Sequence, residues 1–70
     1  MEMEPVESVA IKAIGYDPEA KTLRIQFHSG STHEFSGVPV EVHKNFVAAE
    51  SKGHFFQKKI RPKYEQEKVT

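Results

Sequence analysis

The stretch SGVPVEVHKNFVAAESKGHFF, residues Ser36 to Phe56, decides the fold because the hydrophobic period changes at its start. Upstream, apolar residues alternate with polar ones, as in strands, whereas here they recur every three to four residues, as in a helix. Pro39 suits the first helical position, where a missing N–H costs no hydrogen bond, and Gly53 is the expected C-terminal stop. The expected apolar stripe is Val42, Phe46 and Ala49, flanked by His43 and Val47. The stretch therefore predicts one amphipathic helix.

Three strands are expected before this helix, at residues 6–17, 22–28 and 31–36. In the first, the hydrophobic alternation changes phase, so we expect a bulge near Ala13. In the second, three apolar residues share a face: Leu23, Ile25 and Phe27. A three-residue turn at 28–30 is expected to follow, because it pairs Leu23 with Phe35 and keeps both on the core face.

A shorter second helix is expected from His54 to about Arg61, where Phe56 and Ile60 lie four residues apart on one face. Pro62 disfavours helical backbone at the residue before it and so ends this helix. The fold class is α+β, in the order β-β-β-α-α. We expect a three-stranded antiparallel β-meander covered on one face by an amphipathic helix, with a short second helix.

Composition narrows the class of protein. The 70 residues include no cysteine, so neither disulfides nor thiolate metal sites can stabilise the fold. No apolar run approaches the roughly 20 residues that span a bilayer, and the acidic start is unlike a secretory signal. We expect a cytoplasmic protein with one domain at residues 6–64 and flexible segments at 1–5 and 65–70.

The order and spacing of these features resemble the KTSC domain, a short bacterial family named after the C-terminal domains of lysyl-tRNA synthetases. The resemblance covers most of the chain and rests on Ser8, Gly15-Tyr16-Asp17, Leu23, Ile25, Phe27, Gly30, Val38-Pro39, Val42, Ser51-Lys52-Gly53, Phe55-Phe56, Ile60 and Tyr64. Two departures stand out: the family's central Tyr-x-Tyr is His33-Glu34-Phe35 here, and a helix position that is often aromatic is His43. Because the family occurs beside a tRNA-handling enzyme, the resemblance implies an RNA partner by association.

Positive charge is concentrated near the C-terminus, although 10 basic and 10 acidic side chains balance overall. Residues 52–63 contain no acidic side chain. Lysine and arginine can neutralise phosphates, and an exposed aromatic ring can stack on an unpaired base. Phe55 is the candidate for stacking if Phe56 and Ile60 face inward. The candidate nucleic-acid-binding residues are Lys52, Phe55, Lys58, Lys59, Arg61 and Lys63.

Other interpretations stay open. The basic segment could be a solvated helix surface whose two phenylalanines belong to the core. Alternatively, the chain could be an adaptor that binds a protein through a sheet edge or through the open sheet face of Arg24, Gln26, Thr32 and Glu34. An enzyme is least favoured, because no nucleophile elbow or third orienting acid accompanies the serines and histidines. No cofactor is expected, and the histidines at 28, 33, 43 and 54 follow no metal-ligand spacing.

Two of these histidines, His33 and His43, fall on predicted inner faces and could meet where the sheet contacts the helix. A packed histidine is the more common role at such positions than a ligand. If both are buried, their protonation in mild acid should destabilise the fold, because a charged imidazole is costly to bury.

Overall fold

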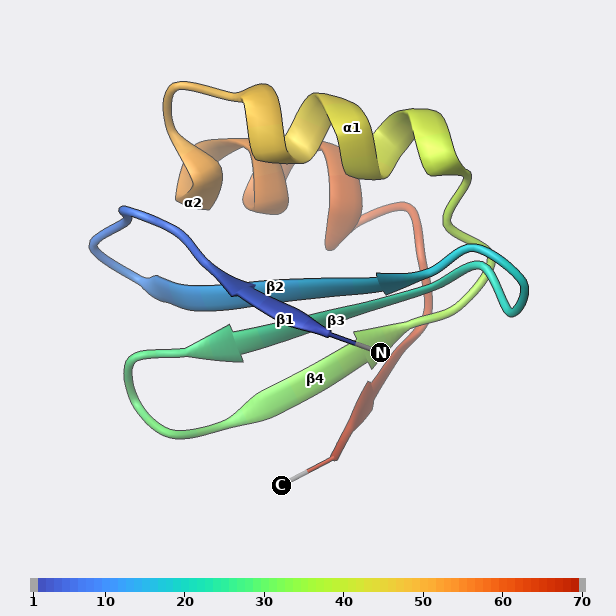
Figure 1. Cartoon of the computed structure of the whole chain (residues 1–70), viewed down its shortest axis with the longest axis horizontal. Helices are drawn as coiled ribbons and strands as arrows, with labels where there is room; N and C mark the ends of the chain where they lie inside the picture. Colours follow the sequence, from blue (N-terminus) through green and yellow to red (C-terminus); the bar gives the residue numbers. More distant parts are fainter. Residues whose placement is uncertain (1, 70) are drawn as a thin grey trace.

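The computed structural model describes residues 2–69 and packs its helices on one face of an antiparallel sheet (Figure 1). The 5-stranded sheet has the order β1-β2-β3-β4-β5. The strands are β1 Met3–Pro5, β2 Ile11–Asp17, β3 Thr22–Phe27, β4 Thr32–Phe35 and β5 Gln66–Lys68. The helices are α1 Val40–Ala48, α2 Lys52–Phe55 and the π-helical segment η1 Phe56–Ile60. The α+β class and the covering helices are thus confirmed.

The expected bulge is present in β2. The pairing of β2 with β3 changes register between Ile11 and Ala13. Because the extra residue shifts the alternation by one, Ile11 and Ile14 both belong to the buried core despite their odd spacing.

The expected turn also joins β3 to β4. The register pairs Leu23 with Phe35 and Ile25 with His33. Gly30 has φ +100, a left-handed conformation that only glycine adopts without strain. The three-residue turn therefore places the apolar residues of both strands on one face.

The strand count differs from the three that the sequence predicted. The two additional strands, β1 and β5, pair with β2 and β4 within the segments 1–5 and 65–70 that were expected to be flexible. Strands of three residues are too short to show an alternation of apolar and polar residues, so the sequence pattern could not predict β1 and β5. Met1 and Thr70, at the ends of these segments, lie outside the described residues.

The first predicted strand is also shorter than expected. It begins at Ile11, and residues 6–10 form the connection from β1 instead. The Ser8 hydroxyl accepts a hydrogen bond from the Ile11 N–H at 3.3 Å, which closes this connection. Val9, expected to lie in the strand, is 100% exposed.

The prediction that Gly53 stops the long helix is wrong. The helix α1 ends at Ala48, because Ala49 has extended backbone with φ −68 and ψ 141. This conformation needs no left-handed glycine, and Gly53 lies inside α2. Pro39 is the residue just before α1 rather than its first helical residue, and its carbonyl accepts the Val42 N–H at 3.0 Å.

The core lies between the sheet and the helices and joins the elements into one unit. Its fully buried side chains are Ile11, Ile14, Leu23, Ile25, Phe35, Val38, Phe46 and Ile60. Of the expected helix stripe, Phe46 is fully buried; Val47, expected to flank the stripe, is 37% exposed. Phe56 adds edge-to-face contacts with Phe27 and Phe35, at centroid distances of 5.4 and 5.5 Å.

Val38 connects the sheet to the helical layer through both of its peptide groups. Its N–H donates to the Lys21 carbonyl at 2.9 Å, and its carbonyl accepts from the Tyr16 hydroxyl at 2.5 Å. Both partners lie at the β2–β3 hairpin, where Lys21 has φ 52. Burial and the adjacent Asp17 carboxylate raise the pKa of the Tyr16 phenol, so the hydroxyl keeps its proton at neutral pH.

The two inner-face histidines have different ring partners. His43 stacks on Tyr16 with ring centroids 4.7 Å apart and an interplanar angle of 9°. His33 lies edge-on to Phe27, 5.5 Å away. Burial lowers the pKa of His43, whereas the nearby Glu4 carboxylate acts in the opposite direction.

We predict that Tyr16→Phe lowers the free energy of unfolding by about 1 kcal/mol, because the Val38 carbonyl loses a hydrogen-bond donor. Urea denaturation measures this difference. Tyr64→Phe is the matched control, since none of the side-chain hydrogen bonds within residues 2–69 involves the Tyr64 hydroxyl. Equal losses in the two variants would contradict a specific role for the Tyr16 hydroxyl.

We also predict that His43 makes the fold less stable in mild acid. Since burial lowers its pKa in the folded state, the unfolded chain binds the proton more tightly. Stability should therefore fall as pH drops through about 6.5 and level off below the folded-state pKa. His43→Phe keeps an aromatic ring on Tyr16 and should show a smaller loss between pH 7.5 and 5.5. Identical pH profiles for both proteins would refute this assignment.

Candidate nucleic-acid interface

An open groove of about 530 Å³ lies beside α2 and η1. It is lined by Ala49, Glu50, Ser51, His54, Phe55, Lys58 and Lys59. Three of the six candidate residues, Phe55, Lys58 and Lys59, are therefore brought together. Their spacing of three and four residues places them on one side of the helical segment.

Phe55 is fixed by the core rather than free to rotate. Its ring stacks on that of Phe46, with centroids 5.5 Å apart and an interplanar angle of 19°. Phe46 is fully buried, so one ring face of Phe55 is covered by a rigid neighbour. Phe56 and Ile60 face the core, which is the condition under which Phe55 was expected to serve as a stacking residue. Phe55 thus has a packing role and also lines the groove.

Lys58 and Lys59 are exposed and make no ion pair within residues 2–69, where the one ion pair joins Arg24 to Glu34. They belong to η1, a wide helical turn in which the Arg61 N–H bonds to the Phe56 carbonyl at 2.9 Å. Such π-helical turns are frequent at functional sites. Both ammonium groups are available to an anionic ligand at the groove.

Lys52 has a structural contact of its own. Its ammonium donates to the Ala49 carbonyl at 2.7 Å, which satisfies a carbonyl left open where α1 ends. Lys52 lines a second groove of about 280 Å³ together with Glu7, Ser8, Val9, Ala10, Glu50, Ser51 and Gly53. Glu50 and Ser51 line both grooves, so the two are adjacent.

The remaining candidates, Arg61 and Lys63, lie in the turn after η1 and line neither groove. The sequence did not predict Glu50, Ser51 or His54 as groove residues. For Ser51 a signal existed, because serine is a preferred N-cap, and its hydroxyl does accept the His54 N–H at 3.3 Å. Glu50 gave no comparable signal, since its place depends on how the chain turns between α1 and α2.

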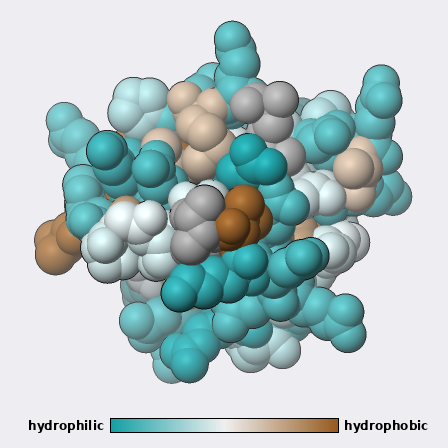
Figure 2. Space-filling model, turned by 90° about the horizontal axis from the view of Figure 1, so that it is seen from below, coloured by the Kyte–Doolittle hydropathy of each residue, from teal (hydrophilic) through white to brown (hydrophobic). Residues whose placement is uncertain are grey.

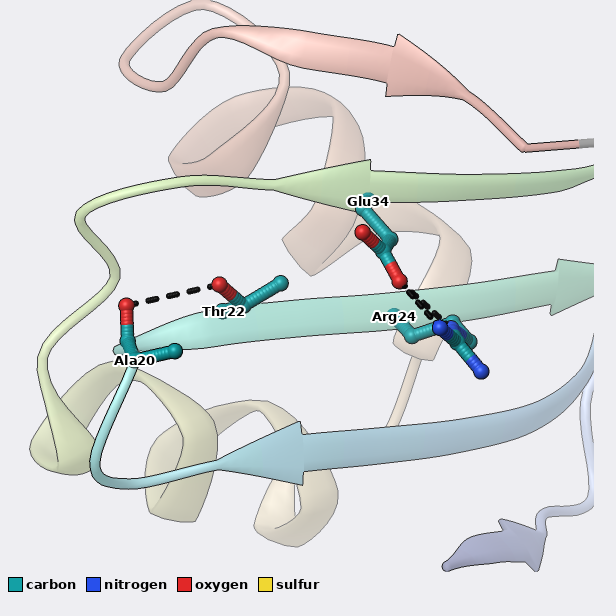
Figure 3. A network of polar contacts seen from close by, with 4 residues as sticks. All are labelled: Ala20, Thr22, Arg24 and Glu34. Carbon is teal, nitrogen blue, oxygen red and sulfur yellow. Dashed lines mark hydrogen bonds and ion pairs between the residues drawn. The ribbon is translucent and has the colours of Figure 1, made fainter. Parts of the chain in front are cut away.

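The open face of the sheet, the alternative binding surface, is mainly hydrophilic (Figure 2). On it, Arg24 and Glu34 form a cross-strand ion pair in which the Arg24 Nε donates to Glu34 Oε2 at 2.7 Å (Figure 3). At the adjacent hairpin, the Thr22 hydroxyl donates to the Ala20 carbonyl at 3.3 Å (Figure 3). The edge strands β1 and β5 have three residues each and offer little main chain for pairing with a partner.

Among residues 2–69, no group of three or more histidine, cysteine, aspartate or glutamate side chains is arranged to hold a metal ion. In the same part of the chain, no helix has the length and apolar character needed to cross a membrane.

Comparison with known proteins places the chain in a family. The family model for the KTSC domain matches residues 7–64. The chain belongs to the KTSC domain family. The crystal structure of a KTSC domain protein from Yersinia pestis shares 43% sequence identity, covers 99% of this chain and 97% of that one, and superposes with a TM-score of 0.93.

Relatives occur alone and as part of longer proteins. A protein from Tsukamurella paurometabola is 44% identical over 62 residues, which span 89% of this chain and 92% of that protein. A lysine–tRNA ligase from Nostoc sp. is 38% identical over 64 residues, which are 91% of this chain but 11% of the ligase. The KTSC domain is therefore a small unit without an established catalytic activity that also forms a minor part of a large enzyme.

We predict that Lys52→Met lowers the free energy of unfolding by about 1 kcal/mol, because the Ala49 carbonyl loses its charged donor. Methionine preserves most of the apolar stem of the side chain. Lys59→Met is the control, since Lys59 is exposed and makes no such bond among the described residues. Chemical denaturation of both variants checks the prediction, and an unchanged midpoint for Lys52→Met would overturn it.

Proposed function

We propose that the chain is a non-catalytic domain that binds single-stranded RNA weakly through the groove beside α2 and η1. The observation that carries the proposal is the position of Phe55. Its ring is held by Phe46 and shares the groove with Lys58 and Lys59, which make no ion pair with any residue from 2 to 69. Proteins that bind single-stranded nucleic acids combine aromatic stacking surfaces with nearby cations, and the groove contains both.

The two kinds of side chain would contact different parts of the nucleic acid. An unpaired base would stack on the groove side of the Phe55 ring, because the other face already packs on Phe46. Lys58 and Lys59 would neutralise the flanking phosphates and release their counterions. Two such contacts provide modest affinity, so the binding should be weak and sensitive to salt.

The relatives support an RNA partner by association. The Nostoc protein that contains a matching segment is a lysine–tRNA ligase, which acts on tRNA. A cytoplasmic location, which we also propose, would give this chain access to RNA. The net charge of +0 argues for a local binding site rather than a long-range electrostatic surface.

We predict that the full chain binds a fluorescent ten-nucleotide uridine RNA more tightly at about 50 mM than at about 200 mM salt. Two phosphate contacts predict a slope of about −1.4 for the logarithm of affinity against the logarithm of salt concentration. Phe55→Leu should weaken binding about tenfold, because a leucine fills the space but cannot stack. Fluorescence anisotropy measures both effects, and circular dichroism confirms that the variants fold.

Charge reversal tests the location of the site. Lys58→Glu with Lys59→Glu should abolish binding, whereas Arg61→Glu with Lys63→Glu is the matched pair outside the grooves and should retain most of it. Equal losses in both pairs would show a diffuse basic surface rather than this groove. Absence of binding even at low salt, to RNA of any base composition, would reject the RNA proposal and favour a protein partner on the open sheet face.

A further inference from the structure

We propose that Glu50 selects the base bound in this groove and that it favours guanine. The inference rests on the proposed RNA binding and adds a specificity determinant to it. Glu50 lies in the connection between α1 and α2 and lines both adjacent grooves. It is the acidic residue of a groove whose other charged residues are Lys58 and Lys59.

The Glu50 carboxylate has no partner in the part of the chain that the structure describes. It forms no ion pair there, although lysines line both of its grooves. An ionised carboxylate can only accept hydrogen bonds, so a ligand group that bonds to Glu50 must be a donor. A phosphate offers none and would be repelled, whereas a base edge can supply them.

The backbone on either side of Glu50 is well fixed. The N–H of Ala49 bonds to the Phe46 carbonyl, and the Ala49 carbonyl accepts the Lys52 ammonium. On the other side, Ser51 caps α2 through its hydroxyl. Glu50 is exposed, and its side chain projects from a connection whose backbone is anchored on both sides.

The chemistry of the four bases then sets an order of preference. In the proposed complex, a base stacked on Phe55 would turn its Watson–Crick edge toward Glu50, which lines the same groove. Guanine has two adjacent donors on that edge, N1–H and N2–H, which match the two oxygens of one carboxylate. Adenine and cytosine each offer one amino group, whereas uracil places carbonyl oxygens on both sides of its single N–H. Guanine should bind best and uracil least well.

A variant without the Glu50 carboxylate distinguishes base recognition from simple repulsion between the carboxylate and phosphates. If Glu50 only repelled phosphates, its removal would strengthen binding to every sequence equally. If it reads the base, its removal should abolish the preference for guanine while leaving uridine RNA bound as tightly as before or more tightly. The two roles can therefore be distinguished by comparing sequences within one variant.

The test compares a ten-nucleotide uridine RNA with the same RNA carrying one central guanosine, by fluorescence anisotropy at about 50 mM salt. Wild-type protein should bind the guanosine RNA about tenfold more tightly, as expected for one bidentate contact to a base. Glu50→Ala should bind both RNAs alike. Glu19→Gln, which removes a carboxylate in the β2–β3 turn, should retain the preference.

Each outcome decides a different point. Equal wild-type affinity for the two RNAs would overturn the role of Glu50 and leave the RNA proposal intact. If a folded Glu50→Ala protein still preferred the guanosine RNA, another residue would select the base and the inference about Glu50 would be wrong. Failure of the wild-type protein to bind either RNA would reject both the inference and the proposed function.

Discussion

The fold depends on one constraint, the attachment of Val38 to the β2–β3 hairpin. Its N–H and carbonyl bond to Lys21 and Tyr16, and its side chain is fully buried. Pro39 follows at once and α1 begins one residue later, so the direction in which the helix leaves the sheet is set at this point. A buried peptide group must be hydrogen-bonded, and both groups of Val38 meet that requirement only when the helix enters here.

Beyond this point, contacts between aromatic rings determine how the groove residues are positioned relative to the core. The helix α1 brings Phe46 to the core, and Phe46 supports the ring of Phe55 on the next helix. On the other side of that helical segment, Phe56 packs against Phe27 and Phe35 of the sheet. Adjacent phenylalanines thus have separate partners, and the rotation of α2 and η1 is fixed. Lys58 and Lys59 reach the groove because of this rotation.

The sequence predicted what side-chain periodicity encodes. The bulge near Ala13, the turn at Gly30 and the pairing of Leu23 with Phe35 all follow from keeping apolar residues on one face. Side-chain periodicity does not predict β1 and β5, because these short strands are held by main-chain pairing with β2 and β4. Helical periodicity also allowed Phe55 to be assigned to one face of the second helix. The position of Glu50 could not be predicted, because it depends on the extended backbone of Ala49, which has no sequence signature.

The groove also shows how a neutral domain can carry a local charge pattern. Acidic side chains predominate before the helices, and residues 52–63 have none, so the balance of +0 conceals an uneven distribution of charge along the chain. At an ionic strength near 0.15 M, charges more than about 8 Å apart are largely screened. A ligand in the groove would therefore respond mainly to the groove residues themselves, not to the rest of the protein. Under these conditions, selectivity must come from short-range contacts, such as stacking on Phe55 and hydrogen bonds to a base edge.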